Sequence, residues 1–287
     1  MMKVNVVGKF LGDEKNKSYP DKTYLIVRPE VPAPDGMLKP VRVVPPESRG
    51  FGAADVLREL GTVAVMCDLG RLPDIGIGER VSLTAVYWPV LRPRWSGWLG
   101  EVVDASESDG VFVLDGEVKA ADGAARPFGF ELKGALTSRR LDEGSEWARM
   151  GCEVERGEVP GWLLRKVKVR QNGFKKVVPA EEKLGTIEIL ADVGQMNRIR
   201  RGGLFEARGE CWPIRVPYWS ERTGKAELSV IPEMEFRALE VSALSGNPDV
   251  VTVPGEPAKP EDASLPGMSG GPEVAATSAE GRKGRRV

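Results

Sequence analysis

Tryptophan, proline and arginine recur together in two segments of this 287-residue chain. The first segment is YWPVLRPRWSGW at 87–98, and the second is CWPIRVPYWS at 211–220. Aromatic side chains can stack on nucleic-acid bases for about 1–3 kcal/mol per base, and arginines neutralise phosphates. Because prolines four residues apart do not fit a helix interior or a central strand, each segment is predicted to be a stiff loop or the edge of a long hairpin. Such a segment would present aromatic and basic side chains to a ligand.

A second basic group lies at 165–170, where the sequence is RKVKVR. Successive side chains of a strand point to opposite faces, so Lys166, Lys168 and Arg170 are expected on one face, where they could follow a phosphate backbone. The matching stretch at 41–44, VRVV, is nearly uncharged, which indicates that the two regions need not bind equally. A third run, RIRR at 198–201, fits either a phosphate contact or an ordinary solvated loop.

The candidate binding residues are the aromatic and basic side chains of these segments. They are Trp88, Arg92, Arg94, Trp95, Trp98, Lys166, Lys168, Arg170, Arg200, Arg201, Trp212, Arg215, Tyr218 and Trp219. An alternative interpretation places Trp88 and Trp212 in the core, shared by both segments because the fold requires them. Trp95 and Trp219, between proline and serine at the expected tip, are predicted to be more exposed.

The sequence offers little for catalysis. Histidine is absent, which excludes Ser-His-Asp and Cys-His arrangements, an imidazole base and any histidine metal site. The three cysteines, Cys67, Cys152 and Cys211, are widely spaced and form no zinc or disulfide pattern. No Walker, dinucleotide or nucleophile-elbow motif is present. We therefore predict a non-enzymatic protein with no catalytic residue, cofactor or metal.

Charge is segregated along the chain although the net charge is only −1. Residues 160–225 contain fourteen basic and seven acidic side chains, an excess of seven positive charges, whereas residues 101–159 are correspondingly acidic. Such segregation produces a local potential that the net charge conceals. Two solvated faces of opposite sign are the alternative interpretation.

The chain contains a long internal repeat. Residues 60–100 align with 184–224 at a constant offset of 124 without a gap, so that LGTVAVMCDLG lies over LGTIEILADVG and WPVLRPRWS over WPIRVPYWS. The identical pairs are Leu60/Leu184, Gly61/Gly185, Thr62/Thr186, Asp68/Asp192, Gly70/Gly194, Ile75/Ile199, Gly78/Gly202, Trp88/Trp212, Pro89/Pro213, Pro93/Pro217, Trp95/Trp219, Ser96/Ser220 and Gly100/Gly224. The sequence therefore predicts two copies of one domain that pack as a pseudo-twofold pair.

Short strands dominate both copies. Alternating β-branched residues bounded by glycine predict strands at 62–68 and 187–191. Further strands are expected at 4–10, 23–27, 41–44, 80–87, 99–103, 128–136, 162–170, 175–178, 204–212 and 227–231, with a short helix at 53–60. Five or six strands in about 120 residues predict an all-β protein of two tandem OB-like small barrels. A β-sandwich is the competing fold.

The predicted boundaries are 1–124 for the first repeat, 125–244 for the second and 245–287 for a tail. The tail is rich in Pro, Gly, Ala and Ser, has few large apolar residues and ends in a basic tip, so it is expected to be disordered. No run approaches the roughly 18 apolar residues of a membrane helix, and the amino terminus lacks a signal-type apolar region. A cytoplasmic location is predicted, in the host cytoplasm if the protein is viral.

The order of elements resembles the single-stranded DNA-binding proteins of filamentous phages and related small replicons. The shared features are an amino-terminal Met-x-Lys-Val strand, an extended basic wing, a G-T-[VI]-x-[VI] strand and an aromatic hairpin. The resemblance implies OB-type domains that work as twofold dimers and stack aromatic rings on bases, so that two fused copies would form such a dimer within one chain. The WP-x-x-x-P-x-W element departs from that pattern. The basic carboxyl-terminal tip also differs from the acidic tip of cellular single-strand binders, so a partner-recruiting tail is not supported.

Two functions follow from these observations. The first is non-enzymatic, sequence-tolerant binding of single-stranded DNA, or of RNA, in phage or plasmid replication, with the chain as a pseudo-dimer that assembles further on the strand. The second is a structural or adaptor module of a virion or assembly complex, because tryptophan and arginine also dominate protein interfaces.

Overall fold

The computed structural model describes residues 1–17, 19–45, 52–71, 74–104, 109–141, 146–155, 158–171 and 177–244. Within these ranges the chain is almost entirely β-structure, with one α-helix of four residues, α1 (Val193–Met196). The predicted tail at 245–287 lies outside the described residues.

The strands follow the same order in the amino-terminal half (2–120) and the carboxyl-terminal half (128–243). The first half holds β1 (Met2–Lys15), β2 (Lys22–Pro29), β3 (Pro40–Val43), β4 (Ala54–Leu57), β5 (Glu59–Leu60), β6 (Val63–Asp68), β7 (Arg80–Leu91), β8 (Pro93–Ser96), β9 (Glu101–Asp104), β10 (Asp109–Leu114) and β11 (Lys119–Ala120). The second holds β12 (Phe128–Leu141), β13 (Trp147–Val154), β14 (Lys166–Arg170), β15 (Val177–Glu181), β16 (Lys183–Leu184), β17 (Ile187–Asp192), β18 (Leu204–Arg215), β19 (Pro217–Ser220), β20 (Lys225–Leu228) and β21 (Glu233–Ala243).

Each half closes into a five-stranded barrel. In the first half, β1 pairs with β2, β2 with β6, β6 with β10, β10 with β7 and β7 with β1. In the second half, β12, β13, β17, β21 and β18 close in the same order. The third and fifth barrel strands run parallel in both halves, as Val65 opposite Phe112 and Ile189 opposite Phe236 show. The predicted OB-like barrels are confirmed, and the β-sandwich is wrong.

A glycine lets the first strand of each barrel serve two neighbours. β1 pairs with β7 up to Lys9 and with β2 from Gly8 onward. A Cβ atom on Gly8 would lie 2.2 Å from the carbonyl oxygen of Arg28, and one on Gly134 of β12 would lie 2.5 Å from that of Glu153. Only a residue without a side chain fits such a close backbone approach.

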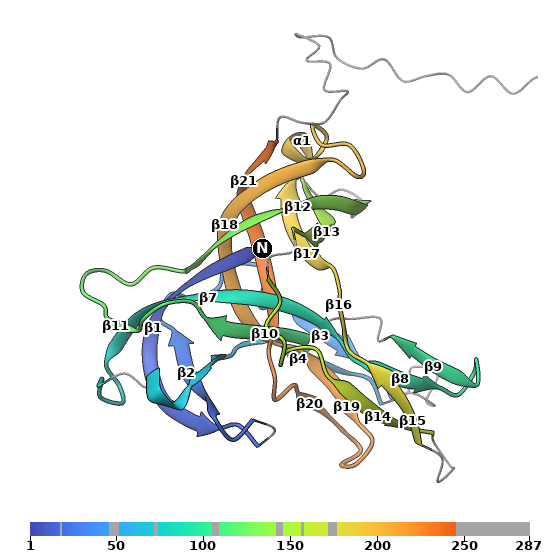
Figure 1. Ribbon diagram of the computed structural model, residues 1–287. Helices are drawn as coiled ribbons and strands as arrows, with labels where there is room; N and C mark the ends of the chain where they lie inside the picture. The colour runs from blue at the N-terminus through green and yellow to red at the C-terminus, as the bar shows by residue number, and fades with distance from the viewer. Residues whose placement is uncertain are drawn as a thin grey trace, which may run out of the picture. The chain divides into compact units, whose positions relative to one another are not determined.

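Two hairpins project from each barrel (Figure 1). The second and third barrel strands are joined through β3–β4 in the first half and β14–β15 in the second. The fourth and fifth are joined through β8–β9 and β19–β20. Arg80 of β7 and Leu204 of β18 begin equivalent strands 124 positions apart, so the repeat is structural as well as sequential.

The two halves make the same contacts with each other. β1 pairs with β12 around Val4 and Phe130. β5 of the first half adds to β18 of the second, while β16 of the second adds to β7 of the first. The Gly61 amide donates to the Pro213 carbonyl at 2.7 Å, and the Gly185 amide donates to the Pro89 carbonyl at 2.8 Å. Each half therefore completes the sheet of the other with the equivalent residues.

The same hydrogen bonds correct the expectation about the prolines. Pro89 and Pro213 lie inside long strands, not in loops, because their carbonyls still accept from the neighbouring strand while the missing N–H is not required there. The predicted helix at 53–60 is also wrong, because these residues form the end of a hairpin and the exchanged strand β5. Strands β13 and β21 were not predicted.

The hydrophobic core runs through both barrels without a break. Tyr87 of the first half packs edge-on against Phe236 of the second, with ring centroids 5.1 Å apart, and Phe130 meets the same ring at 5.5 Å. Burying an aromatic side chain contributes roughly 1.5–3 kcal/mol. The shared core fixes the hairpins of one half against those of the other.

Candidate nucleic-acid interface

Hairpin β8–β9 of the first half contacts β14 of the second (Figure 1, lower right). A groove forms at this contact. Its volume is about 580 Å³. The side chains that line it are Arg92, Pro93, Arg94, Trp95, Arg165, Val167, Lys168, Val169, Arg170 and Glu182. We call it the β8/β14 groove. Two predicted segments that are distant in the sequence, at 87–98 and 165–170, therefore meet in one place.

Alternation within β14 divides charged from apolar side chains. Lys166, Lys168 and Arg170 are exposed, whereas Val169 is buried and Val167 is half-buried. The prediction that these three cations share one face is confirmed. Lys166 reaches Glu181 at 3.6 Å across the hairpin, and both side chains are largely exposed, so this ion pair contributes little.

A buried carboxylate orients two of the groove arginines. Glu182 is only 5% exposed, and its carboxylate lies 3.5 Å from Arg165 Nε and 4.0 Å from Arg92 Nε. It also accepts a hydrogen bond of 3.1 Å from the Arg165 backbone amide, while the Glu182 amide donates to the Arg165 carbonyl at 3.0 Å. Buried charge is stable only when it is paired and hydrogen-bonded. Glu182 therefore fixes the wall of the groove.

An aromatic cluster supports Arg165 from the other side. Its guanidinium lies over the ring of Tyr19 at 5.1 Å, and the Tyr19 hydroxyl donates to the Trp162 carbonyl at 2.8 Å. The two rings meet edge-on at 5.4 Å. Burial raises the pKa of the Tyr19 hydroxyl, although the nearby Arg165 charge opposes this shift. The sequence interpretation missed Tyr19, Trp162 and Glu182, because none belongs to a recognisable pattern.

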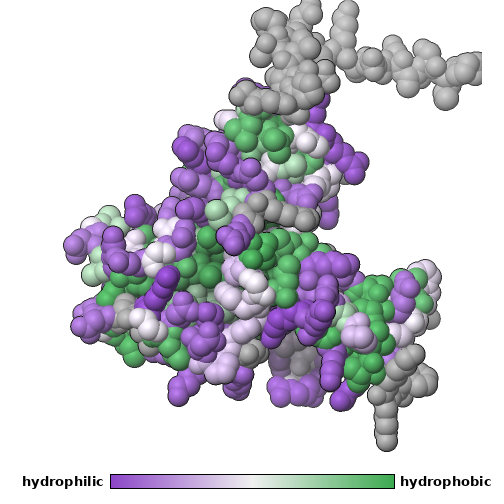
Figure 2. All heavy atoms as spheres, viewed as in Figure 1, coloured by the Kyte–Doolittle hydropathy of each residue, from purple (hydrophilic) through white to green (hydrophobic). Residues whose placement is uncertain are grey.

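The remaining groove cations are free to meet a ligand. Arg94, Lys168 and Arg170 are exposed and form no ion pair within the described part of the chain. Figure 2 shows hydrophobic residues beside hydrophilic ones over these hairpins at lower right. Exposed cations and the half-buried Trp95 line the groove, and side chains of these kinds contact the phosphates and bases of single strands.

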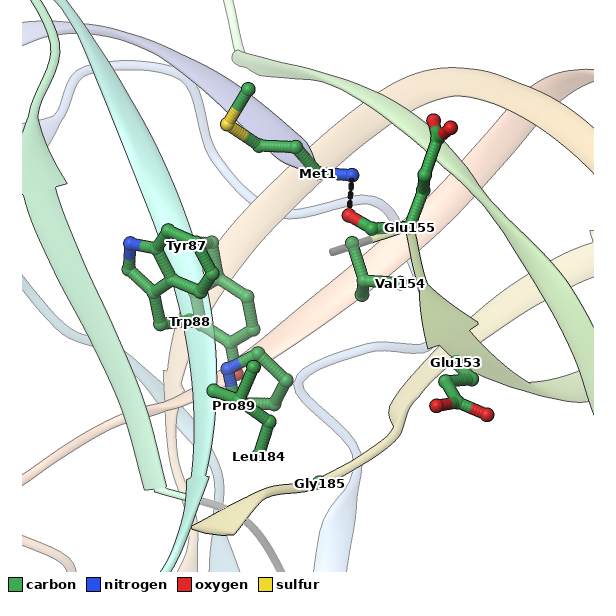
Figure 3. A pocket seen from close by; sticks show the side chains of 9 residues that line it. All are labelled: Met1, Tyr87, Trp88, Pro89, Glu153, Val154, Glu155, Leu184 and Gly185. Atoms are coloured by element: carbon green, nitrogen blue, oxygen red, sulfur yellow. Dashed lines mark hydrogen bonds between the residues drawn. The ribbon is translucent and has the colours of Figure 1, made fainter. Parts of the chain in front are cut away.

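The four candidate tryptophans of the repeat divide into two classes. Trp88 and Trp212 are 5% and 1% exposed, so the prediction that they stack on bases is wrong. Trp88 packs with Val86, Val90 and Leu163 where the halves meet. Figure 3 shows Trp88 and Pro89 there, with Leu184 near Pro89. Glu155 lies across the cavity, where its carbonyl accepts from the Met1 amine. Both tryptophans belong to the core because the strands β7 and β18 continue through them.

Trp95 and Trp219 are half-buried on the edge strands β8 and β19, and so are more exposed than Trp88 and Trp212, as predicted. They do not lie at the hairpin tips. Trp98 does, and it is 93% exposed. Tyr218 is 44% exposed, and its hydroxyl donates to Glu227 at 3.2 Å.

The other predicted residues lie outside the groove. Arg200 and Arg201 border a depression with Ser138 and Arg139 near α1, at the opposite end of the barrel from the hairpins (Figure 1, top). Arg215 donates from Nε to the Ser229 carbonyl at 2.8 Å and lies 3.5 Å from Glu59 of the exchanged strand β5. The structure thus gives Arg215 a role in joining the halves.

Three other cavities in the described residues are smaller than the β8/β14 groove. The cavity at the seam in Figure 3 has a volume of about 20 Å³, room for a single water molecule. No group of three potential metal ligands occurs in the part of the chain that the structure covers. No helix among those residues is long and apolar enough to span a membrane.

Comparison with known proteins gives similarity at the level of solved structures. No family model matches the chain, and no curated protein matches it. The wild-type single-stranded DNA-binding protein from Thermus aquaticus superposes with a TM-score of 0.42 at 12% identity, covering 87% of this chain and 95% of that one. A deletion mutant of the same protein, which also carries a point substitution, superposes with a TM-score of 0.39 at 12% identity, covering 91% of this chain and 98% of that one. Both scores are below 0.5, so the function proposed below is derived from the residues of this chain.

Proposed function

We propose that this protein binds single-stranded nucleic acid, DNA in the first instance, without sequence preference and without catalysis. The observation that supports the proposal most directly is the convergence of Arg92, Arg94 and Trp95 with Lys168 and Arg170 in the β8/β14 groove. Elements from both halves are needed to build it, and a buried carboxylate holds its wall in place.

The chemistry of the groove suits an unpaired strand. Exposed cations along β14 neutralise successive phosphates, and each neutralised phosphate releases counterions. Trp95 borders the groove and Trp98 extends from the adjacent hairpin tip, so bases that face away from the phosphates can stack on indole rings. Stacking does not distinguish bases strongly, which is the reason for the expected sequence tolerance.

The proposed setting is phage or plasmid replication in the cytoplasm. It is supported by the resemblance in strand order to filamentous-phage single-strand binders. The reciprocal contacts between the halves support the interpretation of the chain as a pseudo-dimer made from one polypeptide. Further assembly along the bound strand is part of the proposal.

Binding experiments with defined oligonucleotides test this function. Oligo-dT should quench the tryptophan fluorescence and shift the protein on a gel, whereas a duplex of equal length should bind much more weakly. The same quenching and gel-shift measurements with oligo-U test whether the protein also binds single-stranded RNA. No quenching and no shift at low salt with any of these probes would contradict the proposal and favour the adaptor function instead.

A further inference from the structure

The pseudo-symmetry of the fold creates a second position equivalent to the β8/β14 groove. There, hairpin β19–β20 of the second half contacts β3 of the first. Strand registers define the equivalent residues: Pro40 to Val43 lie opposite Leu57 to Ala54, as Lys166 to Val169 lie opposite Glu181 to Val178. We call this position the β3/β19 face.

The cations of the groove are mostly absent from the equivalent face. The β8/β14 side carries Arg92, Arg94, Arg165, Lys168 and Arg170, which line the groove, and Lys166, which lies beside them on β14. The equivalent positions of the β3/β19 side are Val216, Tyr218, Lys39, Pro40, Arg42 and Val44. Six basic residues on one side therefore correspond to two on the other.

Arg42 and Lys168 occupy equivalent positions but face different neighbours. Arg42 lies opposite Asp55 across the β3–β4 ladder, whereas Lys168 lies opposite Pro179 across β14–β15. An opposite charge directly across a ladder attracts a cation and weakens its attraction for phosphate. In hairpin β19–β20, the negative charges of Glu221 and Glu227 balance the positive charges of Arg222 and Lys225. Glu227 also accepts hydrogen bonds from Tyr218 and Thr223.

We infer that only the β8/β14 groove holds a strand, so that each chain takes one single strand and not two antiparallel ones. Two equal grooves related by a pseudo-twofold axis would bind two strands of opposite direction. The loss of cations from one of them leaves a single site with one direction along the bound strand. This inference rests on the proposed function.

Stoichiometry and a matched pair of variants test it. An oligo-dT of about eight nucleotides, within the range that one OB barrel covers, is titrated into the full chain at low salt and at protein concentrations well above the dissociation constant. We expect saturation at one oligonucleotide per chain. Saturation at two would overturn the inference, whereas no binding at all would contradict the proposed function itself.

The matched variants are Lys168→Ala and Arg42→Ala, two exposed residues at equivalent positions. Lys168→Ala should reduce the slope of log affinity against log salt by about 0.7, and Arg42→Ala should leave it unchanged. Equal reductions would overturn the inference. Thermal melting of both variants verifies that each remains folded.

Discussion

The tryptophans of this protein fall into buried and exposed side chains. Trp212 is fully enclosed, whereas Trp98 is almost fully exposed at the tip of β8–β9. Identity within the repeat does not mark exposure, because the identical pair Trp88 and Trp212 is buried, whereas the exposed Trp98 pairs with Arg222. Identity between the halves therefore cannot be used to select the tryptophans of a binding surface.

This distinction gives a direct prediction. Trp212→Ala should destabilise the protein by about 3–5 kcal/mol through lost transfer free energy and a cavity. Trp98→Ala should leave the melting temperature unchanged and reduce the binding free energy by about 1–3 kcal/mol. Chemical denaturation and oligo-dT titration of both variants check the pair. Destabilisation by Trp98→Ala, without a change in affinity, would contradict the assignment of this residue to the binding surface.

The cysteines give a second prediction at this scale. Cys67, Cys152 and Cys211 are buried, and burial raises the thiol pKa of each, that of Cys67 to about 11. The thiolate is the reactive form, so it is scarce at about pH 8. A thiol reagent should label the native protein very slowly and all three residues after denaturation. Rapid native labelling would show that these sites open readily.

Among the elements, the first strand of each barrel depends on one glycine. Gly134→Ala would force a Cβ against the Glu153 carbonyl. We expect a loss of about 1–3 kcal/mol in the free energy of unfolding, as for other overpacked sites. Gly70→Ala is the matched control, because nothing lies within 4 Å of its added Cβ, and it should change stability by less than about 0.5 kcal/mol. Equal urea midpoints would show that the strand can bend without this glycine.

Gly8 and Gly134 illustrate which parts of the strand arrangement could be predicted from the sequence. Alternation predicted the central strands β6, β7, β17 and β18, and the number of strands predicted the barrel class. The gapless repeat at 60–100 and 184–224 predicted that both halves share one fold. The offset increases to 126 in the first strand, so the equivalence of Gly8 and Gly134 lay outside the aligned window. The prolines led to a wrong prediction of loops, because a proline is excluded from a strand only where the neighbouring strand needs its N–H as a donor. Which positions need a donor depends on the exchanged strands β5 and β16.

At the scale of the whole molecule, the β8/β14 groove lies at a contact between the halves. The basic face of β14 could be predicted from alternation, and the basic and aromatic residues near β8 from composition. Their convergence could not, because it follows from the reciprocal packing of two barrels around a shared core. Arg200 and Arg201 are also basic, but they lie near α1, at the end of the barrel opposite the hairpins. Charge in the sequence could not show this, because the position depends on the packing of the barrels.

The salt dependence of strand binding tests the groove most directly. The triple variant Arg94→Ala, Lys168→Ala, Arg170→Ala removes three exposed groove cations that lack ion pairs in the described structure. A control triple variant removes three exposed cations that do not line the groove, through Arg28→Ala, Lys119→Ala and Arg126→Ala.

Each lost phosphate contact changes the slope of log affinity against log salt by about 0.7 for a single strand. We therefore predict that the groove variant reduces the slope for oligo-dT by about two, while the control variant retains the wild-type slope and both keep the wild-type melting transition. An unchanged slope in the groove variant, or an equal loss in the control, would show that phosphates do not lie in the β8/β14 groove.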